Sequence, residues 1–536
     1  MRVTLKAWVA SGSPWVWITA GAVSVSLVMV IGLVALIAGN GLSHFWPARV
    51  AELTLAGDPP RVLLGELADS ETVAASRVRD AGGVVPEGAT VVRRVLVKRG
   101  NRDIDGQDFQ WLNQPEIARI TYPPDVVVIE RLDWGNLYGR ITGLKEGGTD
   151  VALDSLPERL ARVAQLRAEL DHLQRNEIGA VNYALERLRL REKASDSGVA
   201  EERKALEARY EALASRLQVL NAELSRDRLV FTTVEGKSRE VPFEKVVRVY
   251  RPNDMGPWQQ VAHYADKLWE FVSDVPREAN TEGGVFPAIF GTVLLVIIMS
   301  VFVTPLGVIA AVYLREYAKP GPITSAIRIA VNNLAGVPSV VYGVFGFGFF
   351  VYFLGGSIDE IFFADALPSP TFGTPGLLWS SLTLTLLTVP VVIVATEEGL
   401  TRIPRSIREG SLALGATKAE TLWRTVLPMA TPAMMTGLIL AVARAAGEVA
   451  PLMMVGVVKL APALPLDGNF PFLHLDRKFM HLGFHIYDVG FQSPNVEAAR
   501  PLVYSTALLL LVIIVSLNLA AVRLRNRLRE KYSAAE

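Results

Sequence analysis

Six long apolar runs constrain the fold of this chain more than any other feature of its 536-residue sequence. Each run holds about 20 or more mostly apolar residues, the length that a helix needs to cross the roughly 30 Å hydrocarbon core of a bilayer. Inside lipid, a helix satisfies its own backbone polar groups. We therefore predict an all-α polytopic membrane protein with six transmembrane helices. The runs are Trp15–Ala38, Val285–Leu314, Ile327–Leu354, Gly376–Ala395, Pro432–Val458 and Leu502–Val522.

A polar block from about residue 40 to 284 separates the first apolar run from the second. Two of its segments, Asp125–Leu132 and Arg228–Tyr250, are rich in β-branched residues and predict strands. Between them, apolar residues recur at spacings of three and four, which predicts two helices with an apolar seam. We interpret the block as an α+β insertion with an antiparallel coiled-coil hairpin at about residues 156–226, whose arms break at Ala194–Gly198.

An amphipathic stripe follows the polar block. Trp258, Val261, Tyr264, Leu268 and Phe271 recur at helical spacing just before the second apolar run. This pattern is typical of a helix that lies in the membrane interface, and we predict such a helix here.

The basic residues predict how the chain crosses the membrane. With six spans, four groups of Lys and Arg fall on one side, which the positive-inside rule makes cytoplasmic. We expect both termini in the cytoplasm of a bacterium and the polar block on the periplasmic side of its inner membrane. The first run is longer than a signal-peptide core and lacks a clear cleavage site, so an uncleaved anchor is expected. The groups are Arg2 and Lys6; Arg315 and Lys319; Arg402, Arg405, Arg408, Lys418 and Arg424; and Arg523, Arg525, Arg527, Arg529 and Lys531.

Composition and motifs exclude several function classes. The chain has no cysteine, so it has no disulfides, thiol nucleophiles or thiolate metal sites. Its formal net charge of zero gives no sign of nucleic-acid binding. Gly236-Lys237-Ser238 resembles the end of a phosphate-binding P-loop, but Phe231 stands where the motif needs its first glycine. No Ser/His/Asp hydrolase motif is evident.

Three histidines in the last outward loop are a weak metal candidate. His481 and His485 are four residues apart, as on one helical face, and His474 with Asp476 lies nearby. No glutamate follows His481 as in an H-E-x-x-H motif. We expect exposed or interfacial histidines and no metal site.

The segment Arg408–Pro428 is charged and helix-prone. Ser406 to Glu409 and Thr417 to Glu420 each have the form of a capping box, and Gly415 lies between them. We predict a short helix, a glycine bend, and a second helix running to Leu427-Pro428. Such an element suits docking into a cleft of a soluble partner, or lying on lipid headgroups. Its apolar face comprises Leu412, Ala416, Ala419, Leu422 and Val426.

This segment resembles the EAA loop of ABC-importer permeases. Glu409 is followed by Gly410 and Ser411 in place of the two alanines, and Gly415 keeps its spacing. Thr425 replaces the isoleucine before Leu427-Pro428. The resemblance implies a loop that seats in an ATPase subunit and transmits its motion. The coupling residues that it implies are Glu409, Gly415, Thr417, Lys418, Glu420, Arg424, Leu427 and Pro428.

Four further stretches resemble the PstA-type phosphate permeases: Pro305–Tyr317, Val337–Phe347, Thr396–Gly410 and Ala443–Met453. In the last of these, Val449 replaces the family's threonine. The resemblance implies a type I ABC-importer permease fold and phosphate import without bond chemistry on this chain. It implies four kinds of partner: a related second permease, two ATP-binding subunits, a periplasmic phosphate-binding protein and the lipid bilayer. ATP and Mg would be bound by the ATPase subunits, and no cofactor by this chain.

Two charged residues stand out in the fifth apolar run. Arg444 and Glu448 lie about midway along Pro432–Val458, at a spacing that would place them on one helical face. A charge at mid-bilayer is costly, so both are expected to face protein or water. They form either a structural ion pair or a transient phosphate site, in which the guanidinium attracts the anion and the carboxylate keeps its binding weak.

Polar residues in two other runs allow the same two interpretations. Hydroxyls and amides in a membrane helix line a path or join packed helices. These residues are Asn332 and Asn333 in the third run, and Ser380, Ser381, Thr383, Thr385 and Thr388 in the fourth.

The domain prediction combines these observations. The expected units are residues 1–39 with the first span, 40–284 as periplasmic insertion, 285–525 as permease domain and 526–536 as cytoplasmic tail, with a coupling loop at 399–428. Two alternatives stay open: a membrane-anchored coiled-coil scaffold of the envelope, and a permease for another oxyanion such as sulfate or molybdate.

Overall fold

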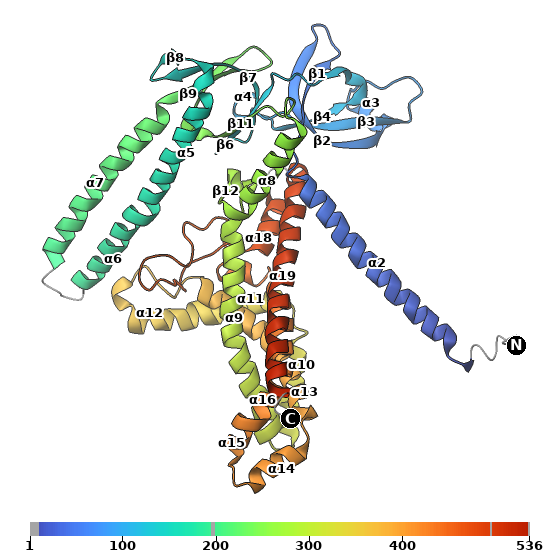
Figure 1. Cartoon of the computed structure of the whole chain (residues 1–536), viewed down its shortest axis with the longest axis vertical. Coiled ribbons are helices and arrows are strands. Elements are labelled where there is room, and N and C mark those ends of the chain that lie inside the picture. The colour runs from blue at the N-terminus through green and yellow to red at the C-terminus, as the bar shows by residue number, and fades with distance from the viewer. Residues whose placement is uncertain (1–9, 194–198, 494–495, 534–536) are drawn as a thin grey trace.

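The computed structural model describes residues 10–193, 199–493 and 496–533. Arg2, Lys6 and the predicted break at Ala194–Gly198 lie outside these ranges. Figure 1 shows an upright helical bundle, a layer of strands above it, and a helical hairpin that returns from the strands toward the bundle. One long helix, α2, leaves the bundle at its upper end and diverges from it.

Six helices within the described residues are long and apolar enough to cross a membrane. The first, α2 (Ser13–Ser43), touches the last near its own C-terminus, where the Ser505 hydroxyl donates to the carbonyl of Gly41 at 2.8 Å. The remaining spans are α9 with η6 (Phe286–Tyr317), α11 with η7 and α12 (Ser339–Phe362), α13 (Leu377–Arg402), α15 with η9 and α16 (Lys418–Ala445), and α19 (Val496–Ser533, apolar over Ala499–Arg527).

The third span begins later than predicted. The segment predicted to start at Ile327 is divided into α10 (Pro322–Leu334) and a separate helix, α11, that begins at Ser339. Pro338 caps α11 in an extended conformation. A proline disfavours the helical conformation in the residue before it, so the helix is interrupted here. The prediction that Asn332 and Asn333 belong to the third span is therefore wrong: both lie exposed near the end of α10.

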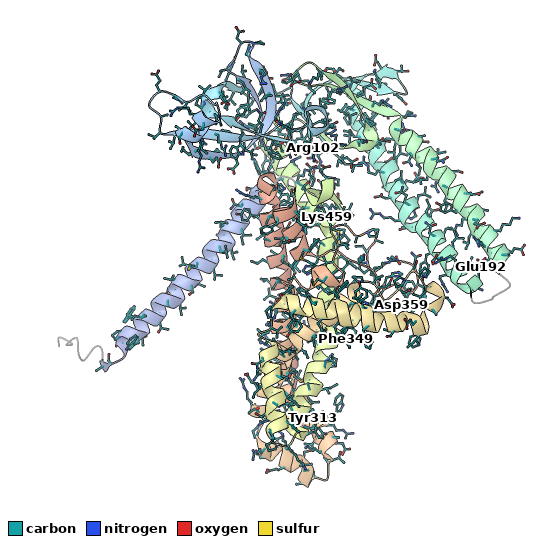
Figure 2. The ribbon with its side chains drawn as sticks, turned by 180° about the vertical axis from the view of Figure 1, so that it is seen from behind. Arg102, Glu192, Tyr313, Phe349, Asp359 and Lys459 are labelled. Atoms are coloured by element: carbon teal, nitrogen blue, oxygen red, sulfur yellow. The ribbon has the colours of Figure 1, made fainter. Side chains whose placement is uncertain are left out.

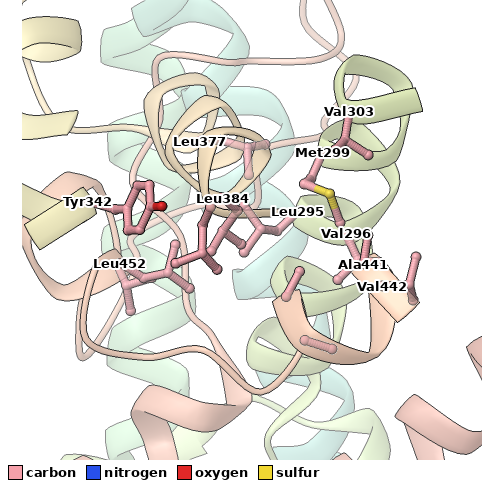
Figure 3. Close-up of a cluster of buried hydrophobic side chains, with 14 of the residues drawn as sticks. Leu295, Val296, Met299, Val303, Tyr342, Leu377, Leu384, Ala441, Val442 and Leu452 are labelled. Carbon is pink, nitrogen blue, oxygen red and sulfur yellow. The ribbon is translucent and has the colours of Figure 1, made fainter. Parts of the chain in front are cut away.

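The core of the bundle joins α9, α13 and α16. Figure 3 shows side chains of these helices meeting those of the third span, among them Met299, Leu384 and Tyr342. A Cβ at Gly437 of α16 would lie 2.9 Å from the Ala395 side chain and 3.2 Å from the Cα of Val392, so only glycine allows this approach. The three helices therefore pack closely, and their burial is what fixes the bundle.

An antiparallel five-stranded sheet opens the insertion, which no sequence pattern above predicts. Its order is β4-β3-β2-β1-β5. Its apolar core includes Leu53, Val97 and Leu112. The strands are β1 (Val50–Leu55), β2 (Arg61–Ala74), β3 (Val91–Lys98), β4 (Phe109–Asn113) and β5 (Ile117–Thr121).

A second antiparallel sheet follows, and it contains the two segments for which strands are predicted. Its order is β10-β9-β7-β6-β11, with β8 paired to β7. Gly236, at φ +76°, turns the chain between β9 and β10, so Gly236-Lys237-Ser238 lies in a hairpin and precedes no helix. The strands are β6 (Val127–Arg131), β7 (Leu137–Glu146), β8 (Thr149–Val151), β9 (Asp227–Thr232), β10 (Ser238–Pro242) and β11 (Val246–Tyr250).

A helical hairpin is inserted in the sequence between β8 and β9. One arm is α5 (Leu156–His172), continued by η3 (Leu173–Ile178) and α6 (Gly179–Lys193), and the other is α7 (Val199–Ser225). The two arms bury an apolar seam that contains Leu173, Val181, Leu213 and Leu220. The ring of Tyr183 lies 6.3 Å from that of His474, so the hairpin reaches the loop between the fifth and sixth spans.

Short elements complete the chain. Figure 2 shows the reverse side, with Glu192 near the hairpin tip and Asp359 on α12. The remaining α-helices and strands of the described residues are α3 (Ala75–Asp80), α4 (Arg102–Asp105), α8 (Pro257–Ser273), β12 (Pro276–Arg277), β13 (Glu282–Gly283), α14 (Arg405–Ala413), α17 (Leu452–Val455) and α18 (Leu482–Tyr487).

Candidate coupling loop and transport pathway

The predicted coupling loop forms two helices at the end of the bundle opposite the sheets (Figure 1). Gly415 follows α14 and has φ +89°, a left-handed backbone conformation that glycine adopts without strain. Thr417 then caps the second helix: its hydroxyl accepts from the backbone N–H of Glu420 at 3.2 Å. The Glu420 carboxylate accepts from the N–H of Thr417 at 2.9 Å. The capping box at Thr417 is therefore confirmed.

Two details of the predicted loop are wrong. Pro404 precedes α14 as its cap, and Ser406 lies inside the helix without a capping hydrogen bond. The second helix also does not stop at Leu427-Pro428 but continues into the fifth span. Proline removes a helix donor, and the wider π-helical turn over Leu422–Val426 accommodates the carbonyl left without its usual partner.

Glu316, at the end of the second span, joins both arms of the loop. Its carboxylate accepts from Nη2 of Arg408 at 2.8 Å, and its backbone carbonyl accepts from Nζ of Lys418. Arg408 also donates to the carbonyls of Ile403 at 2.8 Å and Leu400 at 2.9 Å, at the end of α13. One guanidinium thus connects the C-terminal ends of the second and fourth spans to α14. Sequence reasoning missed Glu316, whose only signal is its place beside a cluster of cations.

The predicted apolar face of the loop is exposed only in part: Leu412 and Ala419 are exposed. Leu422 and Val426 are buried against the bundle, where Leu400 and Ala430 meet them. Leu414 and Trp423 instead remain 91% and 77% exposed. A large apolar side chain that is exposed on a short charged loop is a typical contact residue for a partner. Neither Leu414 nor Trp423 was predicted, because both stand outside the helical spacing of the predicted face.

The other predicted coupling residues lie where a partner can reach them. Leu427 and Pro428 are half-buried where the loop becomes the fifth span. The residues with exposed positions are Glu409, Gly415, Thr417, Lys418, Glu420 and Arg424.

Arg444 and Glu448 do form an ion pair, with Nε of Arg444 3.6 Å from Oε1 of Glu448. The prediction that both lie on one face of a continuous helix is wrong, because α16 ends at Ala445 and Glu448 follows the turn at Ala446 and Gly447. Gly447 just after the helix and Pro451 beyond it are the signals for this end. The two side chains are 32% and 21% exposed, so the pair is open on one side.

The surroundings fix the depth of Arg444 in the bundle. Gly437, two turns earlier, lies against Val392 of α13, and Gly456, after the turn, lies against Gly376 at the start of α13. Arg444 therefore lies between these two levels, in the half of the bundle nearer the sheets. Its neighbours Ala441 and Ala445 belong to the apolar core. The charge of Arg444 is thus partly exposed beside an apolar core, where an unpaired charge would be costly.

The five predicted hydroxyl residues of the fourth span are buried, and all except Ser380, whose hydroxyl has no hydrogen-bond partner among the described residues, are bonded within their own helix. Each of four donates to the carbonyl one turn earlier, and this geometry favours helix packing over a path lining. The four bonds run from Ser381 to Leu377 at 2.8 Å, from Thr383 to Trp379 at 2.7 Å, from Thr385 to Ser381 at 2.8 Å and from Thr388 to Leu384 at 2.7 Å.

The three histidines are buried, so the prediction of exposed or interfacial positions is wrong. Burial lowers the pKa of His481 and of His485 to about 4. Nε2 of His474 lies 2.9 Å from Asp467, which also accepts from Arg477 at 2.6 Å. Among the described residues, no group of three His, Cys, Asp or Glu residues is placed to hold a metal ion.

Comparison with known proteins places this bundle in a family. Residues 303–530 match the family model described as the binding-protein-dependent transport system inner membrane component. Over 247 residues the chain is 35% identical to the phosphate transport system permease protein PstA 1 of Mycobacterium tuberculosis (strain CDC 1551 / Oshkosh), covering 45% of this chain and 71% of that protein. This chain belongs to the PstA-type family of ABC-transporter permeases.

Other relatives agree with the PstA-type assignment. PstA of Mycobacterium leprae is 35% identical over 239 residues, which cover 44% of this chain and 69% of that protein. Among solved structures, the MetNI methionine ABC transporter matches with 18% identity and a TM-score of 0.33, covering 49% of this chain and 98% of that one. The sheets and the hairpin lie outside the matched residues 303–530.

Proposed function

We propose that this chain is a non-catalytic permease subunit of an ATP-driven importer of inorganic phosphate. The observation that carries this proposal is the 35% identity to PstA 1, a phosphate transport system permease. The loop of α14 and α15, with exposed Leu414 and Trp423 and a glycine bend at Gly415, supports it. A subunit of this kind forms half of the transmembrane pathway and receives motion from a separate ATPase.

In the proposed complex, two ATP-binding subunits hold ATP and Mg, and this chain binds no cofactor. Leu414 and Trp423 seat in one ATPase, and closure of the ATPases moves α14 and α15. A second, related permease completes the pathway, and a periplasmic phosphate-binding protein delivers the anion. The ion pair of Arg408 and Glu316 passes the motion to the second and fourth spans.

The proposed orientation puts the coupling loop and both termini in the cytoplasm of a bacterium with an inner membrane. The loop carries Arg405, Arg408, Lys418 and Arg424, in agreement with the positive-inside rule. The sheets, at the opposite end of the bundle in Figure 1, then lie in the periplasm. The corresponding units are residues 1–39, 40–284, 285–525 and 526–536.

Arg444 and Glu448 are the proposed substrate contacts. A guanidinium matches two oxygens of a phosphate, and the loose 3.6 Å pair leaves its other N–H groups for the anion. Glu448 repels the bound anion and competes for Arg444, which limits the residence of phosphate. A transport path needs this balance, because a tightly held ion does not move on.

The test replaces Arg444 by Gln in the assembled complex in liposomes and measures uptake of labelled phosphate. Loss of hydrogen bonds to a charged group removes about 1.5–3 kcal/mol, so uptake should fall roughly 10- to 150-fold. Arg523→Gln, an exposed cation at the end of α19, is the matched control and should keep uptake. Full uptake by Arg444→Gln, with normal ATPase association, contradicts the assignment of Arg444.

The two alternatives predict different outcomes in the same liposomes. A scaffold transports nothing, and the permease relatives do not favour it. A permease for another oxyanion is suggested only by Val449, which replaces the threonine of the family motif. Competition by sulfate or molybdate at concentrations equal to phosphate would indicate that alternative.

A further inference from the structure

Helix α8 (Pro257–Ser273) is the last α-helix of the insertion before the second span, and it has three different faces. The first face is held by the second sheet. Nζ of Lys267 lies 2.6 Å from the carboxylate of Glu130 on β6, and Arg248 on β11 lies 3.3 Å from the carboxylate of Glu270. Glu130 and Glu270 are both buried, so these ion pairs fix the rotation of α8 about its own axis.

The second face of α8 packs on the outer ends of two spans. The ring of Phe271 lies 5.0 Å from Phe45, which follows the C-terminus of α2. Phe271 also shares a buried cluster with Val285, the residue before α9. Tyr264 lies 5.8 Å from Trp46. Because α2 ends and α9 begins at these contacts, α8 lies at the level where the hydrocarbon core ends.

The third face is apolar and exposed. Trp258 is 87% exposed, Trp269 is 71% exposed, and Val261 is exposed between them. Ala262 and Ala265, on the same side, are exposed as well. The predicted stripe is thus divided: Tyr264, Leu268 and Phe271 face protein, while Trp258 and Val261 face outward together with Trp269, which the sequence pattern had left out.

We propose that the outward face of α8, formed by Trp258, Val261 and Trp269, inserts into the lipid interface and anchors the insertion to the membrane surface. At the end of α2 that packs on α8, Leu42 and Trp46 are exposed as well. Tryptophan favours the headgroup region, where its ring is buried in acyl chains and its N–H meets water. An amphipathic helix held in this plane binds lipid in proportion to its apolar area.

This proposal does not depend on phosphate being the substrate. It assigns a role to a helix that the matched family region does not include. Its consequence is mechanical: with α8 bonded to the sheet on one face and to lipid on another, the insertion keeps a fixed height above the bilayer. The hairpin, whose Tyr183 touches His474, is then held over the outer loops of the bundle.

The chain has no cysteine, so a single cysteine can be introduced for labelling without first replacing native ones. We would make Trp258→Cys, Val261→Cys and Trp269→Cys, attach a nitroxide label, and reconstitute the full chain in vesicles of phosphatidylethanolamine and phosphatidylglycerol. The measurement is the collision rate of each label with oxygen, which concentrates in lipid, and with a water-soluble nickel complex.

Two matched positions calibrate the measurement. Val28→Cys on α2 serves as the lipid reference and Val219→Cys on α7 as the water reference, since both native residues are exposed. The α8 labels should resemble position 28, with a several-fold higher ratio of oxygen to nickel collisions than position 219. A ratio equal to that at position 219 overturns the proposal. Low access to both reagents, which indicates cover by protein, overturns it too.

Discussion

Replacement of Glu316 by Gln tests how the loop is joined to the bundle. The substitution keeps the shape of the side chain and removes its charge. In the structure, the carboxylate of Glu316 accepts a 2.8 Å hydrogen bond from Arg408, and the two side chains are only 12% and 18% exposed. The amide oxygen of Gln can still accept from Arg408, but the guanidinium then has only neutral partners, this amide and the carbonyls of Ile403 and Leu400.

The expected size follows from this burial. A hydrogen bond between charged groups contributes about 1.5–3 kcal/mol to stability. An exposed ion pair typically contributes about 1 kcal/mol or less. If α14 must be held by Glu316 to meet the ATPase, the affinity between the two subunits should fall roughly 10- to 150-fold. If the pair acts only in transmission, affinity is kept and phosphate uptake per ATP hydrolysed falls instead.

The assay measures both quantities on the reconstituted complex: the dissociation constant of the ATPase subunit, and labelled phosphate uptake against ATP hydrolysis. Glu398→Gln is the matched control, because Glu398 is an exposed carboxylate near the same end of α13. Unchanged affinity together with an unchanged ratio of uptake to hydrolysis in Glu316→Gln would refute the role of this ion pair.

Two further predictions concern the loop and the buried histidines. Gly415→Ala and Thr417→Ala should each destabilise the loop by about 1 kcal/mol, because the first strains a positive φ and the second removes a helix cap. The rate of backbone amide hydrogen exchange at residues 417–426 should then rise several-fold. An unchanged exchange rate contradicts this prediction. Burial lowers the pKa of His481 to about 4. The imidazole is therefore protonated below pH 6.5 in the unfolded chain but only below about pH 4 in the folded chain. Thermal stability should therefore fall as pH drops from 6.5 to 4, less steeply in His481→Gln; an equal slope in both proteins is the contrary result.

Where the sequence failed, the missing information was tertiary. The five-stranded sheet went unpredicted although β3 (Val91–Lys98) is rich in valine, because β4 and β5 are five residues long and gain their stability from cross-strand pairs. Glu316 and Arg408 are 92 residues apart and meet only in the folded bundle. The end of α16 at Ala445 was also missed, since the apolar composition continues beyond the helix to Val458.

What the sequence determined by itself is local. Runs of apolar residues predict where spans lie because lipid leaves a backbone few alternatives to a helix, and Thr417 with Glu420 predicts a cap because both partners lie within one turn. The tertiary structure alone decided which faces those elements turn to each other. It buried Leu422, left Trp423 exposed, and divided the stripe of α8 between protein and the outside. A helical period predicts that an apolar face exists, but the neighbours that cover it come from distant parts of the chain.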